Sequence, residues 1–305
     1  MSGEQPAAVG PWAREKLDAL QRYLDYYTKV LKNQRWRTIY VDAYAGGGRA
    51  VVRSAATAGE QPPEAALPLL DEGQIDADQS EFIHGSPLVA LEIPNPFSRY
   101  VFIDPDRARV RELETLQADY ANTRQIDVLP MGAADGIRWV VSRNVSRTTH
   151  RGVVFLDPFG AGMDWATVKA LADTRLFEVV VNFALNMAIQ RMLPNSAQFQ
   201  TGWRERLDTY FGTPNWYDEV YETRNDLLGP VTRKRDDYLN RLLALYLARL
   251  EAAFGLVSLP KLIRNTRGVP LYYLIWAGQH RKGLQGANWI LSMGERLTVA
   301  ARRKR

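Results

Sequence analysis

The feature that most constrains the fold of this 305-residue chain is a series of short apolar runs separated by helical patterns. β-Branched and aromatic residues dominate these runs, and charged helical patterns near 106–120 and 134–147 lie between them. Short strands that alternate with helices predict an α/β fold with a mostly parallel, doubly wound sheet. The predicted strands cover residues 38–42, 100–104, 126–131, 152–160 and 177–183.

The remaining segments are expected to belong to a single domain that spans residues 1–305. Apolar residues at helical spacing predict an amphipathic N-terminal helix over 12–34 that covers the sheet. Prolines, alanines and acids over 50–84 indicate a loop excursion with little regular structure. Residues 184–254 lack clean strand signals and are expected to form a helical insertion. Two closing strands that form an antiparallel hairpin follow, near 256–264 and 270–278.

The absence of cysteine excludes several classes of chemistry within this chain. Disulfides, thiolate zinc sites, iron–sulfur clusters and cysteine nucleophiles all need this residue, so any such chemistry belongs to a partner. No apolar run approaches the roughly 18 residues of a membrane span, and no basic flank followed by an apolar stretch marks the N-terminus. We therefore expect a cytoplasmic protein without membrane contact.

The formal net charge is +5, and most of it lies in a basic tail at residues 300–305. A basic tail can bind nucleic-acid phosphates by releasing counterions. It can equally be a solvated chain end, because runs of like charge repel one another and stay extended. The sequence leaves both interpretations open.

Acidic residues lie at or beyond the carboxyl ends of successive predicted strands: Asp42, Asp104, Asp135 and Asp157. In an open parallel sheet, ligands bind outside this edge, at the point where the strand order reverses. An acid such as Asp104 can accept hydrogen bonds from both hydroxyls of a ribose. The pattern therefore predicts a site for a cofactor that contains a nucleoside.

A glycine-rich turn follows the first predicted strand and reads D-A-Y-A-G-G-G over residues 42–48. It differs from the G-x-G-x-x-G dinucleotide motif and lacks the Gly-Lys-Ser/Thr of a phosphate loop, and by itself it could be a tight connection between a strand and a helix. Its D-x-Y-x-G-x-G form resembles the first motif of class I S-adenosylmethionine methyltransferases. The resemblance implies S-adenosylmethionine as the cofactor, bound by Asp42, Tyr44, Gly46, Gly48, Asp104 and Asp135.

The fourth predicted strand ends in D-P-F-G over residues 157–160. This segment resembles the D-P-P-Y-like segment of amino-methyltransferases of nucleic acids, although Phe159 takes the second-proline position and Gly160 replaces the aromatic residue. The resemblance implies that Asp157 and Pro158 hold the target amine and that Phe159 stacks on the base. The displaced ring could equally pack in the core.

Further motifs occur in a specific order along most of the chain. They are Lys16 with Tyr23 and Leu24, D-A-Y-A-G-G-G-R at 42–49, G-S-P-L at 85–88, F-I-D at 102–104, F-L-D-P-F-G at 155–160, V-N-F at 181–183 with Arg191, F-G at 211–212 before Trp216, and P-L-Y-Y-L at 270–274 running to His280 and Gly283. Together they resemble the three-Cys-motif partner (TcmP) family. One departure is G-A-A-D at 132–135, where that family usually has a G-D-A-like turn. The resemblance implies a methyltransferase fold encoded beside a radical-type protein that carries three cysteines.

Two further polar residues near strand ends are candidates for binding substrate. Asn182 ends the fifth predicted strand, where its amide could bind substrate or close a turn. His280 follows the closing hairpin, where it could act as a general base or lie on the surface. No H-E-x-x-H motif or cluster of His and Asp residues predicts a metal site.

Three functions are compatible with these features. The first is an S-adenosylmethionine-dependent methyltransferase that acts on an amino group of a nucleic-acid base or nucleoside, working with a three-Cys-motif radical-type partner. The second is a non-catalytic binding partner or scaffold with a degraded cofactor site, which the departures at Ala133 and Gly160 favour. The third is a nuclease, which lacks a convincing metal cluster.

Overall fold

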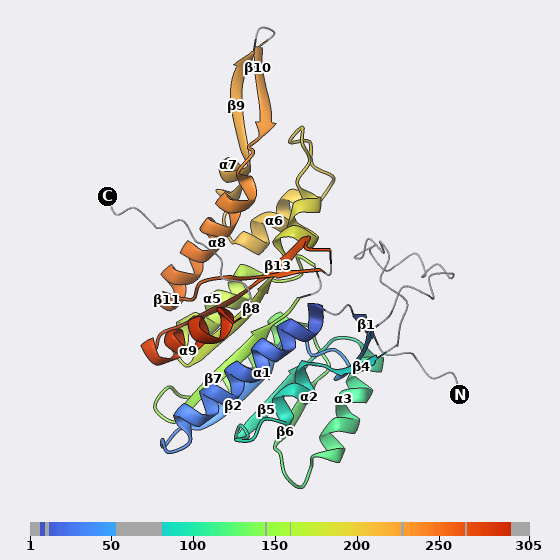
Figure 1. Cartoon of the computed structure of the whole chain (residues 1–305), viewed down its shortest axis with the longest axis vertical. Helices are drawn as coiled ribbons and strands as arrows, with labels where there is room; N and C mark the ends of the chain where they lie inside the picture. Colours follow the sequence, from blue (N-terminus) through green and yellow to red (C-terminus); the bar gives the residue numbers. More distant parts are fainter. Residues whose placement is uncertain are drawn as a thin grey trace, which may run out of the picture.

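A central, mostly parallel sheet organises the residues that the computed structural model describes, which are 7–9, 12–52, 81–143, 145–158, 160–226, 229–265 and 267–293 (Figure 1). Its strands follow the order β11-β13-β8-β7-β2-β5-β6, with β12 also paired to β13. The parallel strands are β2 (Arg37–Asp42), β5 (Arg99–Ile103), β6 (Ile126–Leu129), β7 (His150–Leu156) and β8 (Phe177–Phe183).

The last strands of the sheet run the other way. β13 (Pro270–Gly278) pairs antiparallel with β8, and β11 (Leu256–Val257) and β12 (Lys261–Arg264) pair antiparallel with β13. The strands therefore form a mostly parallel, doubly wound α/β sheet of the Rossmann-like type with a C-terminal antiparallel hairpin, which confirms the predicted α/β fold class. We call the edge where the parallel strands end the carboxyl edge, and the opposite one the amino edge.

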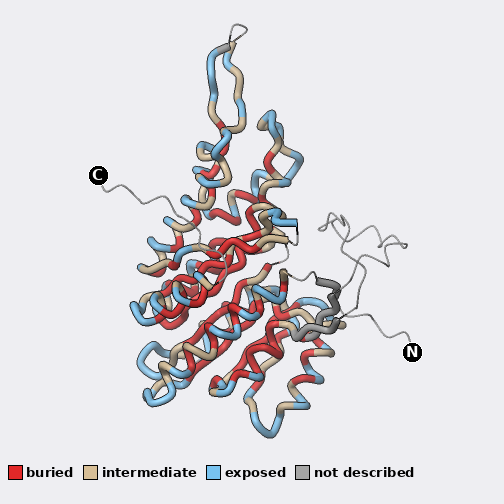
Figure 2. Tube along the Cα trace, in the orientation of Figure 1, coloured by how far each residue is buried: buried red, intermediate tan, exposed pale blue. Residues whose placement is uncertain are grey.

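Helices cover both faces of the sheet, so the buried core lies in two layers (Figure 2). Tyr40 and Phe102 pack on one side, and their neighbours Val41 and Ile103 pack on the other, because side chains alternate along a strand. This double burial explains why the strands appear in the sequence as continuous apolar runs. One face carries α1 (Trp12–Leu31), α2 (Ser86–Leu91), α3 (Arg107–Asp119) and α9 (Arg281–Leu291); the other carries α4 (Ala133–Ser142), α5 (Trp165–Asp173), α6 (Trp203–Phe211), α7 (Trp216–Val220) and α8 (Tyr238–Phe254).

Helix α1 lies across the sheet and runs from its carboxyl edge towards its amino edge. Leu17, Leu20 and Leu24 are buried at helical spacing, which is the amphipathic pattern expected over 12–34. Near its start, Lys16 contacts Asp157 beyond β7. About two turns later, Tyr23 contacts Glu178 near the start of β8. The helix therefore contributes side chains to both edges.

The segment 184–254 contains strands as well as helices. β9 (Tyr221–Asp226) and β10 (Gly229–Lys234) form a separate antiparallel hairpin that extends beyond α7, away from the central sheet (Figure 1). Apart from Tyr221 at its base, the described side chains of the hairpin are intermediate or exposed, and its sequence lacks the apolar alternation that signals a strand. The expectation of a purely helical insertion is corrected by this hairpin.

The excursion expected over 50–84 is bounded by strands β3 (Arg49–Val52) and β4 (Glu81–His84), which pair with each other; β1 (Ala7–Val9) pairs with β3. Residues 53–80 and the basic tail at 300–305 lie outside the described residues. Within the described part of the chain, no helix is both long and apolar enough to cross a bilayer.

Candidate functional site

The strand order places a reversal between β2 and β7. The chain continues from β2 to β5 and β6 on one side and then returns to add β7 on the other side of β2. Asp42 is paired in register with Phe155, so Asp157 lies just beyond the same point. Ligands of doubly wound sheets bind in the crevice at this reversal, so these residues mark the candidate site.

The Asp157 carboxylate is bound by two side chains from other elements. Lys16 Nζ lies 2.5 Å from its Oδ2, and the Asn182 amide donates a 2.5 Å hydrogen bond to its Oδ1. The Lys16 ammonium also lies 5.5 Å from the centre of the Tyr272 ring. The side chains of Lys16 and Asp157 are 14% and 20% exposed, so the pair keeps limited access to solvent.

Asn182 presents an unused acceptor at this position. Because a carboxylate cannot donate, the Asn182 nitrogen must face Asp157, and its Oδ1 must point elsewhere. That oxygen is buried and has no hydrogen-bond partner among the described residues. Buried acceptors are nearly always satisfied, so an unpaired one beside a charged group suits the N–H of a ligand.

Asp42 lies beneath this pair and is fully buried. It accepts hydrogen bonds from Tyr40 Oη at 3.2 Å, from the Tyr44 backbone N–H at 3.4 Å and from the Ser86 hydroxyl. Burial raises the pKa of Asp42 to about 7, and the neighbouring Asp157 carboxylate acts in the same direction. Ser86 therefore bonds Asp42 and does not cap α2, whose N-cap is Gly85.

The glycine turn after β2 contains two glycines with positive φ, of which only one has free space beside it. Gly46 has φ +63° and Gly48 has φ +80°, which favour glycine. A Cβ at Gly48 would lie 2.4 Å from Leu116 Cδ1, whereas a Cβ at Gly46 would meet nothing within 4 Å. The Gly46 face is therefore open, and the Gly48 face is packed.

Asp104 supports this turn from the neighbouring strand. Its Oδ2 accepts the Gly46 N–H at 3.0 Å and its Oδ1 accepts the Asp106 N–H at 2.9 Å, while Arg109 Nη1 lies 3.7 Å from Oδ2. The Asp104 side chain is only 2% exposed. In this conformation the carboxylate stabilises the turn through these hydrogen bonds, and each of its oxygens can accept one further hydrogen bond.

The other residues expected in the site differ in how far they are buried and in what they contact. Asp135 lies exposed in the first turn of α4 and pairs with Arg138. The Tyr44 hydroxyl donates to the Gly162 carbonyl at 3.3 Å. Pro158 is buried, and Phe159 lies outside the described residues.

The structure does not bring His280 to these residues. It is the exposed N-cap of α9, after β13, and β13 runs antiparallel to β8, so His280 lies at the amino edge. The described residues contain no group of three or more His, Asp or Glu side chains that could hold a metal ion.

Lys16 is the site residue that the motifs did not reveal as functional. The sequence could have indicated its position. Helix α1 leads into β2 through a short turn, so it must begin at the carboxyl edge. A basic residue in the first turns of such a helix falls near the strand-end acids.

No family model matches the chain, and no curated protein matches it. Solved structures similar to it include a Legionella pneumophila protein of family DUF519 (13% identity, 88% of this chain and 97% of that one, TM-score 0.42). A putative methyltransferase from Escherichia coli is 13% identical over 85% of this chain and 87% of that one, with a TM-score of 0.33. Spermidine synthase from Thermotoga maritima is 8% identical over 91% and 63%, with a TM-score of 0.42. At these scores, the fold assignment depends on the strand order and register.

Proposed function

We propose that this protein is an S-adenosylmethionine-dependent methyltransferase that acts on an amino group of a nucleic-acid base or nucleoside, with a three-Cys-motif radical-type protein as its partner. One observation carries the proposal: at the strand-order reversal, the Asp157 carboxylate and the unpaired Asn182 carbonyl lie together next to the buried Asp42. Two adjacent acceptors suit the two N–H groups of an amine. The partner rests on the resemblance of the motifs to the TcmP family.

The glycine turn fits the proposed cofactor. The space in front of Gly46 leaves room for a ligand against the backbone, and Asp42, Tyr44, Gly48 and Asp104 fix the shape of the turn. Asp104 would accept hydrogen bonds from the ribose hydroxyls with its remaining lone pairs. Asp135, which is exposed in the first turn of α4, would lie at the edge of the cofactor site. When bound, S-adenosylmethionine supplies a methyl group that is already activated for transfer.

The protein's own task is to position and neutralise the amine. The Asp157 carboxylate and Asn182 Oδ1 would accept its two N–H bonds and so orient the nitrogen lone pair. Positive charge develops on that nitrogen during alkylation, and Asp157 would stabilise it and take the released proton. Lys16 holds Oδ2 of the same carboxylate and acts as a positioning residue.

The alternative of a non-catalytic binding partner or scaffold is favoured by one observation. Asp104 is nearly buried and already binds backbone N–H groups, as a purely structural acid would. The two functions differ in whether the purified chain binds S-adenosylmethionine.

Calorimetric titration with S-adenosylmethionine tests this difference. We expect one site per chain, and we expect Gly46→Ala to weaken binding at least about tenfold, because its Cβ projects into the open space. Gly202→Ala is the matched control: Gly202 also has a positive φ and an open Cβ direction, but it lies before α6. No binding by the wild-type chain at millimolar cofactor would contradict the proposal and favour the scaffold.

A further inference from the structure

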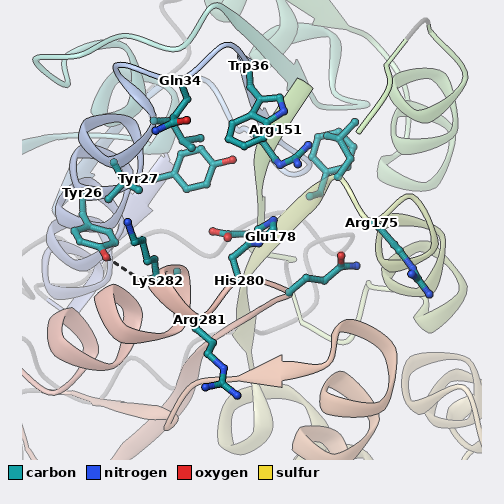
Figure 3. A pocket seen from close by; sticks show the side chains of 16 residues that line it. Tyr26, Tyr27, Gln34, Trp36, Arg151, Arg175, Glu178, His280, Arg281 and Lys282 are labelled. Atoms are coloured by element: carbon teal, nitrogen blue, oxygen red, sulfur yellow. Dashed lines mark hydrogen bonds between the residues drawn. The ribbon is translucent and has the colours of Figure 1, made fainter. Parts of the chain in front are cut away.

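A cavity opens at the amino edge of the sheet, at the end opposite to Asp157. It has a volume of about 390 Å³ and lies between the end of α1, the starts of β7 and β8, and the start of α9 (Figure 3). Small-molecule sites in proteins have volumes of this order. The proposed methyl-transfer site uses none of the residues that line it.

Aromatic side chains form much of the wall. Tyr26 and Tyr27 come from α1, Trp36 precedes β2, and Phe177 begins β8. The Trp36 indole N–H is buried and has no partner among the described residues. Such walls favour a ligand with a flat apolar body, because aromatic rings stack on planar surfaces.

Arg151 places a positive charge inside this cavity. Its guanidinium lies 4.2 Å from the centre of the Trp36 ring, and Nη1 donates to the His150 carbonyl at 2.7 Å and to that of Arg147. Among the described residues, Nε and Nη2 have no hydrogen-bond partner. In Figure 3, Arg151 points towards the middle of the cavity, whereas Arg281 extends away from it.

Glu178 is the acid among the residues that line the cavity. Glu178 accepts a 2.5 Å hydrogen bond from the Tyr23 hydroxyl, and no ion pair joins it to Arg151 among the described residues. Burial raises the pKa of Glu178 to about 7, while the positive charge of Arg151 acts in the opposite direction. The lining also contains the cationic residues Arg175, Arg281 and Lys282. The balance of charge therefore favours an anion.

We propose that this cavity is a binding site for a small molecule with a flat aromatic body and a single carboxylate, which pairs with Arg151. The guanidinium offers two adjacent N–H donors in the geometry that a carboxylate accepts. The aromatic wall would contact the flat body, and Lys282 is an exposed residue of the lining. This inference is independent of the proposed methyl transfer.

Calorimetric titration of the full chain with matched probes tests the proposal. We expect 2-naphthoate to bind, and 2-naphthamide, which has the same body without the charge, to bind roughly 10- to 100-fold more weakly. Arg151→Met should remove the preference for 2-naphthoate, while Lys169→Gln, which removes a surface cation of α5 outside the lining, should leave it unchanged. Should Arg151→Met fail to fold, Arg151→Lys keeps the charge, loses the paired donors and should bind 2-naphthoate more weakly. Equal binding of the two probes, no binding of 2-naphthoate at millimolar concentration, or full affinity in a folded Arg151 variant would overturn the proposal.

Discussion

The ion pair between Lys16 and Asp157 joins the first helix to the strand-order reversal. The sequence predicted Asp157, since an acid before proline at a strand end is a recognisable pattern. It did not predict that Lys16 and Asn182 bind the same carboxylate, because they lie 141 and 25 positions away along the chain. Contacts over such separations become visible only when the topology is known.

Removing Lys16 should leave the Asp157 carboxylate without its cation in a partly buried position. We expect Lys16→Met to lower the free energy of unfolding by about 1–3 kcal/mol, measured by urea denaturation. Lys29→Met is the control on the same helix, because Lys29 pairs with Asp25 at the surface, and it should change stability by less than about 0.5 kcal/mol. Equal effects of the two variants would mean that the Lys16 pair is an ordinary surface pair.

The five parallel strands of the central sheet follow the predicted apolar runs, whereas the β9–β10 hairpin and α9 were not predicted. The strands carry their signal locally, because burial on both faces demands continuous apolar residues. Helix α9 contains Gly283 and Gly286, which disfavour helices in isolation. A Cβ at Gly286 would lie 2.0 Å from Tyr26 Cε1, so close packing of α9 on α1 selects glycine. Tertiary packing thus overrides local propensity here.

Because Gly286 packs against Tyr26, we expect the effect of Gly286→Ala on stability to depend on whether Tyr26 is present. Gly286→Ala should destabilise the protein by about 1 kcal/mol, because the clash with Tyr26 outweighs the gain in helix propensity. In a Tyr26→Ala background the ring is absent, and the same change should stabilise the protein. A thermal-unfolding double-mutant cycle measures both effects. The same sign in both backgrounds would show that Gly286 is not selected by this contact.

At the scale of the whole molecule, the two edges of the sheet each contain a buried acid. Asp42 lies at the carboxyl edge and Glu178 at the amino edge, and burial raises the pKa of each to about 7. The sequence indicated the acids that follow strands, and Asp42 was among them. Glu178 was missed because it begins a strand within an apolar run, where nothing local distinguishes it from a surface residue.

These raised pKa values predict how stability changes with pH. Between about pH 4 and 7 the unfolded chain has lost these protons and the folded chain still holds them, so stability should fall as pH rises through this range. Asp42→Asn should flatten the fall, while Asp173→Asn, an exposed acid in α5, should not. Urea denaturation from pH 4.5 to 8 measures the slope. An unchanged slope in Asp42→Asn would place the pKa of Asp42 near its ordinary value.

We propose above that the residues at the strand-order reversal transfer a methyl group to an amine. The most direct test of this proposal is incubation of the chain, alone and with its proposed partner, with methyl-labelled S-adenosylmethionine and unmodified nucleic acids and nucleosides. We predict label on an exocyclic amino group, and a loss of roughly 10²–10⁴-fold in Asp157→Asn but not in Asp173→Asn. Label at the wild-type rate in a folded Asp157→Asn variant, or no label on any amino group in either condition, would contradict the account.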